Sequence, residues 1–241
     1  MRYFRFPLFI LMFSLSAVAA GQNLQITRGL DEAYLRAKFS MYKPDPWGST
    51  YFETNAKYVG HQLSNTLLLI TRYLNFWEQS PCRNLDIAMG YCGGSTNAGG
   101  VYIPIKSSFT VGAAGKLVAK DHSRMVILQI AYREIAGGDT EVPLFLYSYY
   151  SWNNIMKING FSLFGIAFGQ WDDLTNRETG VRRNVFVVHA TPSVWYNAGR
   201  LVAVDHLSVG IRMDVDYNFA NKKGLKVLPQ AGIRWNFLSA R

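Results

Sequence analysis

The sequence is poor in charged residues and in cysteine. Asp, Glu, Lys and Arg make up only 17% of its 241 residues, whereas soluble domains average roughly 25%. A chain with so few charges is poorly equipped to cover a surface that faces water. Its two cysteines, Cys82 and Cys92, lack the CxxC spacing of redox and zinc sites. If residues 84–92 form a strand, its rise of about 3.3 Å per residue holds the two thiols too far apart for a disulfide.

Long apolar runs, phosphate loops and blocks of basic charge are also absent from the sequence. Beyond residue 22, no stretch reaches the roughly 18 consecutive apolar residues that indicate a transmembrane helix. The glycine-rich segment at 93–100 lacks the Lys of a phosphate-binding loop. The net charge of +9 is scattered, since no run of Lys and Arg exceeds two residues, and we expect no nucleic-acid partner. In a lumen, or at its mouth, the same charge would attract anionic solutes.

The first residues have the three parts of a Sec-type signal peptide. Arg2 and Arg5 precede an apolar run at 6–15, and small residues follow it and end in Ala19 and Ala20. The run is shorter than the approximately 20 residues of a spanning helix, which argues against a signal anchor. We therefore expect residues 1–20 to be cleaved and residues 21–241 to form the exported domain.

The chain is rich in side chains that alternate in polarity, most clearly in a hairpin at 34–58 around a Pro-Asp-Pro-Trp-Gly turn. Successive side chains of a strand point to opposite faces, so each arm has one face without full charge and one charged face. In the first arm Leu35, Ala37, Phe39 and Met41 alternate with Tyr34, Arg36, Lys38 and Ser40; in the second Phe52, Thr54, Ala56 and Tyr58 alternate with Tyr51, Glu53, Asn55 and Lys57.

This alternation recurs along the chain and predicts twelve strands. In the ninth, we expect Gly165, Ala167 and Gly169 to face inward, where bulk would close a pore. In the tenth, Pro192 removes one ladder bond and predicts a bulge. We place the strands at residues 23–28, 34–41, 51–60, 65–77, 85–92, 105–118, 126–133, 142–152, 161–171, 184–197, 207–217 and 227–237.

An exported chain without a transmembrane helix can span a membrane only as a closed barrel. The predicted fold class is therefore an all-β, transmembrane, antiparallel up-and-down β-barrel of about 12 strands in the bacterial outer membrane. Outer-membrane lipid is then a partner of its apolar faces. With the N-terminus in the periplasm, every loop longer than ten residues falls on the external side. A soluble β-sandwich is the alternative, since its strands alternate in the same way.

Three segments carry a resemblance to a known family. They are Met41-Tyr42-Lys43-Pro44-Asp45-Pro46-Trp47-Gly48-Ser49-Thr50-Tyr51-Phe52, Leu74-Asn75-Phe76-Trp77 and Ile233-Arg234-Trp235-Asn236-Phe237. Together they resemble a poorly characterised family of outer-membrane barrels related to Tsx, the nucleoside-specific channel-forming protein. The resemblance implies a twelve-stranded barrel that passes nucleosides or similar small polar solutes. The chain departs from the usual outer-membrane ending, because Leu238-Ser239-Ala240-Arg241 follows Phe237. We expect the barrel assembly machinery to be its partner during biogenesis.

The charged residues of the inward faces are the candidate lumen-lining residues. In one interpretation, they order polar solutes on their way through the lumen. In the other, they only pair with one another and fill a narrow interior. A barrel of this size lies between filled eight-stranded and open sixteen-stranded barrels, so both interpretations stay open. The candidates are Arg36, Lys38, Glu53, Lys57, Arg133, Arg212, Asp214, Asp216 and Arg234.

Two further classes of function stay open beside a channel. His189 and Thr191 share a strand face and could begin a barrel-embedded lipid hydrolase, although the sequence offers no third orienting group. Asp214 and Asp216 also share a face, but paired carboxylates in a lumen more often partner Arg than do acid/base work. The other class is a structural or adhesive barrel that passes nothing. We expect a channel rather than an enzyme, with no catalytic residue, metal or cofactor.

Overall fold

The computed structural model shows a chain built of β-strands. It describes residues 21–60, 62–77, 79–98, 101–121, 123–137, 142–155, 158, 160–175, 182–199, 206–218 and 224–238. The expected signal peptide lies outside the described residues. The strands are β1 (Gly21–Gly29), β2 (Tyr34–Asp45), β3 (Gly48–Val59), β4 (Gln62–Leu74), β5 (Leu85–Ala98), β6 (Val101–Val118), β7 (Arg124–Ile135), β8 (Leu144–Asn153), β9 (Phe161–Thr175), β10 (Arg182–Ala190), β11 (Ser193–Asn197), β12 (Leu207–Asn218) and β13 (Leu225–Leu238).

The strands form one antiparallel sheet that closes on itself. Sequence neighbours pair from β1 to β9 and from β12 to β13, and β1 pairs with β13 to close the ring. Both β10 and β11 lie between β9 and β12. Together they therefore occupy a single strand position of the barrel wall, which we call a stave. The thirteen described strands therefore form twelve staves, and the predicted all-β antiparallel barrel is confirmed.

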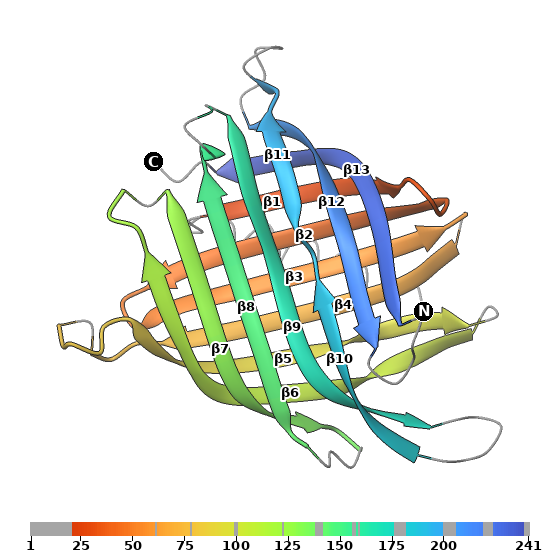
Figure 1. Cartoon of the computed structure of the whole chain (residues 1–241), viewed down its shortest axis with the longest axis horizontal. Coiled ribbons are helices and arrows are strands. Elements are labelled where there is room, and N and C mark those ends of the chain that lie inside the picture. Colours follow the sequence, from red (N-terminus) through yellow and green to blue (C-terminus); the bar gives the residue numbers. More distant parts are fainter. Residues whose placement is uncertain are drawn as a thin grey trace, which may run out of the picture.

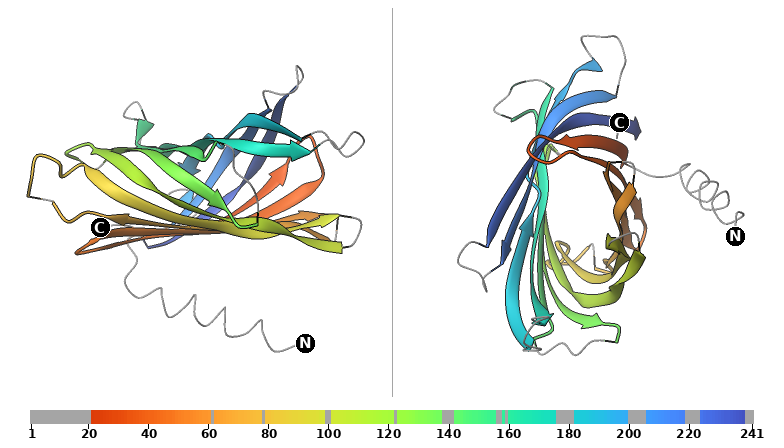
Figure 2. Two further views of the ribbon diagram at one scale, coloured as in Figure 1. Left: turned by 90° about the horizontal axis from the view of Figure 1, so that it is seen from below. Right: turned by 90° about the vertical axis from the view of Figure 1, so that its right-hand side faces the viewer.

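The barrel is flattened into two facing walls. In Figure 1, strands β7 to β12 cross in front of β1 to β6 at a wide angle, and the right-hand view of Figure 2 shows the walls curving toward each other. On one side the walls meet through β13, which pairs with β1 and with β12. Among the described residues, no helix is long and apolar enough to span a membrane.

Most of the buried side chains in the described part of the barrel are polar, and large apolar side chains are exposed along its outer face. On β12, Ile211 and Met213 are exposed, whereas the residues that alternate with them, Arg212 and Asp214, are buried. Gln230 on β13 is fully buried. A soluble domain keeps such apolar residues inside, so the barrel has the reverse polarity that strands facing lipid require.

The tenth stave is broken at Pro192, but it does not contain the predicted bulge. Ala190 pairs with Val215 and Ser193 pairs with Arg212, so the register on β12 is the same on both sides of the break. The pairing with β9 is in step as well. A bulge inserts an extra residue, and none is inserted here. Because proline has no amide hydrogen, Pro192 interrupts the ladder without shifting it.

The glycines of β9 face outward, so their predicted inward placement is wrong. Phe168 pairs with Tyr147, which is buried inside the barrel, and directly paired residues lie on the same face of a sheet. Outside, a Cβ added to Gly169 would lie 2.6 Å from the ring of Phe186. The missing side chain therefore makes room for a ring and not for a pore. The inward set is Phe164, Ile166 and Phe168, and the outward set is Gly165, Ala167 and Gly169.

The lengths of the connections do not distinguish the two ends of the barrel. Strands β5 and β6 extend through most of the glycine-rich segment that the sequence suggested as a loop, and only residues 99–100 separate them. A connection of ten residues, 75–84, lies instead at the end that holds the turn between β2 and β3. No connection between the described strands is longer than ten residues, because the strands of the opposite, external end are longer than predicted. The expectation that every loop longer than ten residues lies at that end therefore stays a prediction.

One side chain near the turn between β2 and β3 departs from the predicted alternation. Met41, expected on the apolar outer face, is only 7% exposed. It pairs with Gln22, which is also buried, beside a register shift between Gln22 and Asn23.

Cys82 and Cys92 are both free thiols, as predicted.

Candidate functional site

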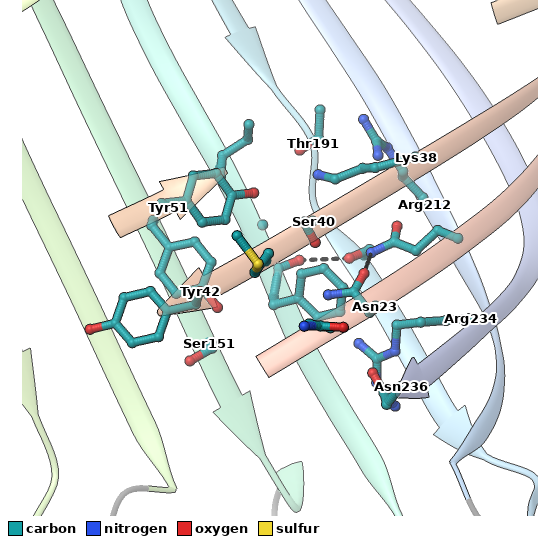
Figure 3. Close-up of a pocket in the computed structure, with 18 of the residues that line it drawn as sticks. Asn23, Lys38, Ser40, Tyr42, Tyr51, Ser151, Thr191, Arg212, Arg234 and Asn236 are labelled. Carbon is teal, nitrogen blue, oxygen red and sulfur yellow. Dashed lines mark hydrogen bonds between the residues drawn. The ribbon is translucent and has the colours of Figure 1, made fainter. Parts of the chain in front are cut away.

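A cavity of about 500 Å³ lies inside the barrel (Figure 3). Its wall includes Asn23 near the start of β1, Asn153 at the end of β8 and Asn197 at the end of β11. These positions lie at the end of the barrel that carries the turn between β2 and β3. From that end the cavity reaches the charged side chains of Lys38 and Arg212.

Lys38 and Glu53 form a buried ion pair between adjacent strands. Alternation places both on the inward faces of β2 and β3, where Lys38 Nζ lies 2.7 Å from Glu53 Oε2. Tyr51, two residues earlier on β3, donates its hydroxyl to the same carboxylate. Burying two charges is tolerated when good geometry and further hydrogen bonds compensate the lost water. Lys38 and Tyr51 line the cavity, and Glu53 fixes both of them.

Asp214 pairs with two arginines at once. Its Oδ2 lies 2.5 Å from Arg36 Nη1, and its Oδ1 lies 3.0 Å from Arg212 Nε. Arg212 and Asp214 share the inward face of β12, whereas Arg36 comes from β2. Asp214 is 1% exposed, so two cations stabilise its buried charge. Arg212 also lines the cavity.

Aromatic rings surround the guanidinium of Arg234. The guanidinium carbon lies 4.8 Å from the ring centroid of Phe164 and 5.2 Å from that of Trp195. The two ring planes are within 11° of parallel. Arg234 Nη2 donates to Ser162 Oγ at 3.2 Å. Cation–π contacts of this kind orient a cation without neutralising it.

The three remaining candidates lie apart from the cavity, whose described lining residues do not include them. Each has its own partner. Lys57 Nζ lies 3.8 Å from Glu32, Arg133 Nη1 lies 2.9 Å from Asp172, and Asp216 Oδ1 lies 2.5 Å from His189 Nδ1. The structure thus brings Arg36, Lys38, Glu53, Arg212, Asp214 and Arg234 to the cavity or directly behind its wall.

The interior beside the cavity is filled. Tyr73, Ala88, Ala114 and Ile127 form a buried apolar cluster, and Tyr149 packs against it. Tyr149 also lines the cavity. The interior therefore combines a filled part on the side of β4 to β7 with an open part near β1, β2 and β11.

Sequence reasoning missed several interior residues. Asp86 and Lys116 face inward and lie 3.4 Å apart, and the alternation that located Arg36 could have located them. Phe164 was missed because the sequence alone does not orient β9, and Trp195 was missed because the sequence alone does not orient β11. Their place beside Arg234 depends on which face of each of these two strands is inside.

The structure gives His189 a carboxylate partner that the sequence did not reveal, namely Asp216. Thr191, which shares the face of His189, is buried and lines the cavity. Asp214 and Asp216 do not act as a pair, because Asp214 binds Arg36 and Arg212 whereas Asp216 contacts His189. Within the described part of the chain, no three His, Cys, Asp or Glu side chains are grouped closely enough to hold a metal ion.

Two carboxylates at the ends of the barrel have lowered pKa values. Asp45 accepts a hydrogen bond from Arg72 at 2.8 Å and one from the Trp47 amide at 2.9 Å. The Arg72 contact lowers the pKa of Asp45 to about 2. At the opposite end, a hydrogen bond from Lys226 lowers the pKa of Glu32. Both carboxylates are therefore ionised at neutral pH.

Several solved structures are similar to this chain at low sequence identity. A membrane protein used in work on in-meso crystallization is 7% identical, with a TM-score of 0.46 over 92% of this chain and 85% of that one. A BenF-like porin from Pseudomonas fluorescens Pf-5 is 8% identical, with a TM-score of 0.42 over 87% of this chain and 58% of the porin. OpdK of Pseudomonas aeruginosa, solved with vanillate, is 9% identical, with a TM-score of 0.43 over 88% and 59%.

The chain thus spans less than two thirds of the length of these two porins. No curated protein matches the sequence. A family model does match, and it covers residues 23–237, nearly the whole of the barrel. The chain belongs to the family described as Domain of unknown function (DUF5020).

Proposed function

We propose that the protein is an outer-membrane channel for small polar solutes. The observation that carries this proposal is the reversed polarity of a closed barrel, with apolar residues exposed outside and ion pairs and a polar cavity inside. Lipid suits the exposed apolar faces, and a closed sheet leaves no unpaired strand edge in the hydrocarbon. The barrel assembly machinery is the partner that inserts such a chain.

Aromatic side chains support a membrane boundary at the turn between β2 and β3. The ring centroids of Trp47 and Phe76 are 5.9 Å apart, and those of Phe76 and Trp77 are 6.2 Å apart. Trp47 and Phe76 are exposed. Such rings favour the level of the lipid headgroups, where girdles of outer-membrane barrels lie. In our proposal this end faces the periplasm.

The ion pairs behind the cavity restrict the solutes that pass. A solute that enters the cavity meets Lys38 and Arg212 before it can reach the opposite end. It must replace contacts that these side chains make with Glu53 and Asp214, so passage favours small solutes with hydrogen-bonding groups. Nucleosides, which the resemblance to Tsx-related barrels implies, belong to this class.

A structural barrel without transport is the alternative, and the filled part of the interior favours it. The cluster around Tyr73 and Ile127, together with the buried ion pairs, narrows any path between the two ends. In this alternative the polar interior only stabilises the barrel.

Conductance separates the two functions. The purified protein should carry a small, stepwise current in planar bilayers and should admit uridine in liposome swelling. Replacing both Arg36 and Lys38 by Ala should change the conductance, because the two cations and their carboxylates narrow the lumen. Leu35→Val, on the outer face of the same strand, is the matched control and should leave the current unchanged. A folded, inserted protein that passes neither current nor solute would instead support the structural barrel.

A further inference from the structure

The charged side chains that line the cavity are all cations. Lys38, Arg212 and Arg234 belong to its wall, and none of the described lining residues is Asp or Glu. In the view of Figure 3, these three lie on one side of the cavity and Tyr42, Tyr51 and Ser151 on the other. A pocket with this lining has a positive potential.

The carboxylates behind the wall do not balance these cations. Glu53 pairs with Lys38, and Asp214 is shared by Arg36 and Arg212. Four cations at or directly behind the cavity therefore meet two carboxylates, which leaves an excess of two positive charges. Arg234 carries part of that excess, because no carboxylate pairs with it in the part of the chain that the structure describes.

The surroundings of Arg234 suit an anionic ligand. Its guanidinium is fixed by Phe164, Trp195 and the hydroxyl of Ser162. Arg234 Nε, a buried donor of a residue in the cavity wall, has no hydrogen-bond partner among the described residues, and neither has Trp195 Nε1 behind that wall. Leaving buried donors unpaired is costly. The oxygens of an anion are the acceptors that a guanidinium binds most strongly.

The rest of the wall suits a ligand with hydroxyl groups. Asn23, Asn153, Ser151 and Asn236 supply amides and hydroxyls that both donate and accept hydrogen bonds. A volume of about 500 Å³ lies in the range of pockets for small organic ligands. Simple inorganic anions would leave most of this space and most of these groups unused.

We propose that the cavity binds a small organic anion, whose carboxylate or phosphate group docks on Arg234 and whose hydroxyl groups meet the amide-lined wall. This proposal rests on the proposed function, since it selects the anionic members among small polar solutes. An uncharged nucleoside would fit the space but would not neutralise the excess positive charge of the cavity. A nucleoside monophosphate satisfies both features.

Calorimetric titration of the full chain, refolded in detergent micelles, tests this site without requiring a current. The probes are uridine, uridine 5′-monophosphate and gluconate, which separate the phosphate from the carboxylate. Uridine 5′-monophosphate, gluconate or both should bind at least about tenfold more tightly than uridine, since hydrogen bonds to charged groups are the strong ones. Equal affinity for uridine and both anions would overturn the proposal.

Variants at Arg234 locate the site. Arg234→Gln should reduce anion affinity about tenfold or more and leave uridine binding unchanged, whereas Arg234→Lys should keep part of the anion affinity. The control is Lys226→Gln, which removes a cation that is 56% exposed at the opposite end and should change nothing. Heat-modified gel mobility shows which variants fold. If Arg234→Gln does not fold, an anion preference that is reduced in Arg234→Lys supports the site, and a preference as strong as that of wild type in whichever variant folds overturns it.

The two proposals fail in different ways. Anion binding that depends on Arg234, in a protein that carries no current, would contradict the channel proposal and support the anion-binding site. The reversal potential in a KCl gradient measures whether the current prefers anions. A current without anion preference, together with equal binding of all three probes, would support the channel and contradict the anion-binding site.

Discussion

Arg36 and Asp214 form an ion pair across the seam where the barrel closes. The strand order at this point is β12, β13, β1 and β2, so the contact between Arg36 on β2 and Asp214 on β12 reaches over both strands of the seam. Residues from the two ends of the sequence are thereby connected by a side-chain contact as well as by the backbone ladder.

Removing Asp214 should weaken this closure. Asp214→Ala leaves Arg36 and Arg212 buried without their carboxylate, and breaking a buried pair costs about 3–5 kcal/mol. Urea unfolding in liposomes measures the loss. Asp216→Ala is the matched control, because Asp216 lies two residues on along the same inward face and its side chain is 50% exposed; it should cost less than about 1 kcal/mol. Equal losses for both variants would show that the seam contact is not special.

A charge on the outer face of β12 should be costly. Met213 is exposed and lies near the middle of the strand, so Met213→Arg should lower the free energy of unfolding in bilayers by about 2–4 kcal/mol. Met213→Leu keeps the face apolar and should have little effect. If the arginine variant is as stable as wild type in liposomes, this face does not contact lipid.

The orientation of the barrel can be read from labelling on intact cells. A cysteine at Asn97, at the end of β5, should react with a membrane-impermeant thiol reagent, and one at Asp45 should not. The external positions Asn176 and Lys222, also expected to react, lie outside the described residues. Reaction at Asp45 but not at Asn97 would mean that the barrel is inserted the other way round.

The contact between Asp45 and Arg72 should make stability depend on pH. The pKa of Asp45 is about 2 in the folded protein and about 3.9 in an unfolded chain. A lowered folded-state pKa adds stability above the unfolded value, and that stability is lost as the pH falls toward the folded value. Wild type should therefore exceed Asp45→Asn in urea midpoint at neutral pH, and the difference should shrink below about pH 4. In an Arg72→Gln background, which lacks the partner of Asp45, Asp45→Asn should show no such trend.

Alternation predicted the number of strands and most of their faces, because the period of two is a local property of extended chain. It succeeded on β12, where Met213 and Asp214 differ sharply in polarity. It failed on β9, where residues 161–171 carry no charge on either face and aromatic or aliphatic side chains alternate with glycine and alanine. There the inside is decided by pairing with Tyr147 on β8, and a period alone carries no information about that partner.

For the candidate site, the sequence predicted which face of a strand a residue occupies better than which residues it contacts. The inward faces of Arg36 and Asp214 follow from the alternation, but their contact depends on the closure register between β1 and β13. The pairing of Lys38 with Glu53 follows more directly, since a short turn joins their two strands. The aromatic surroundings of Arg234 could not be predicted, because they require the correct orientation of β9 and of Trp195 on β11.

The interruption at Pro192 has a consequence for how the barrel opens. Because β10 and β11 keep one register, either segment can separate from β12 and return to the same partners without the other losing its own. The stave that carries the cavity residues Thr191 and Ser193 is thus held as two short segments, of which β11 has five residues. Amide hydrogens of β11 should exchange with solvent earlier than those of the long, uninterrupted β12. Local opening of the barrel would then begin at the wall of the cavity.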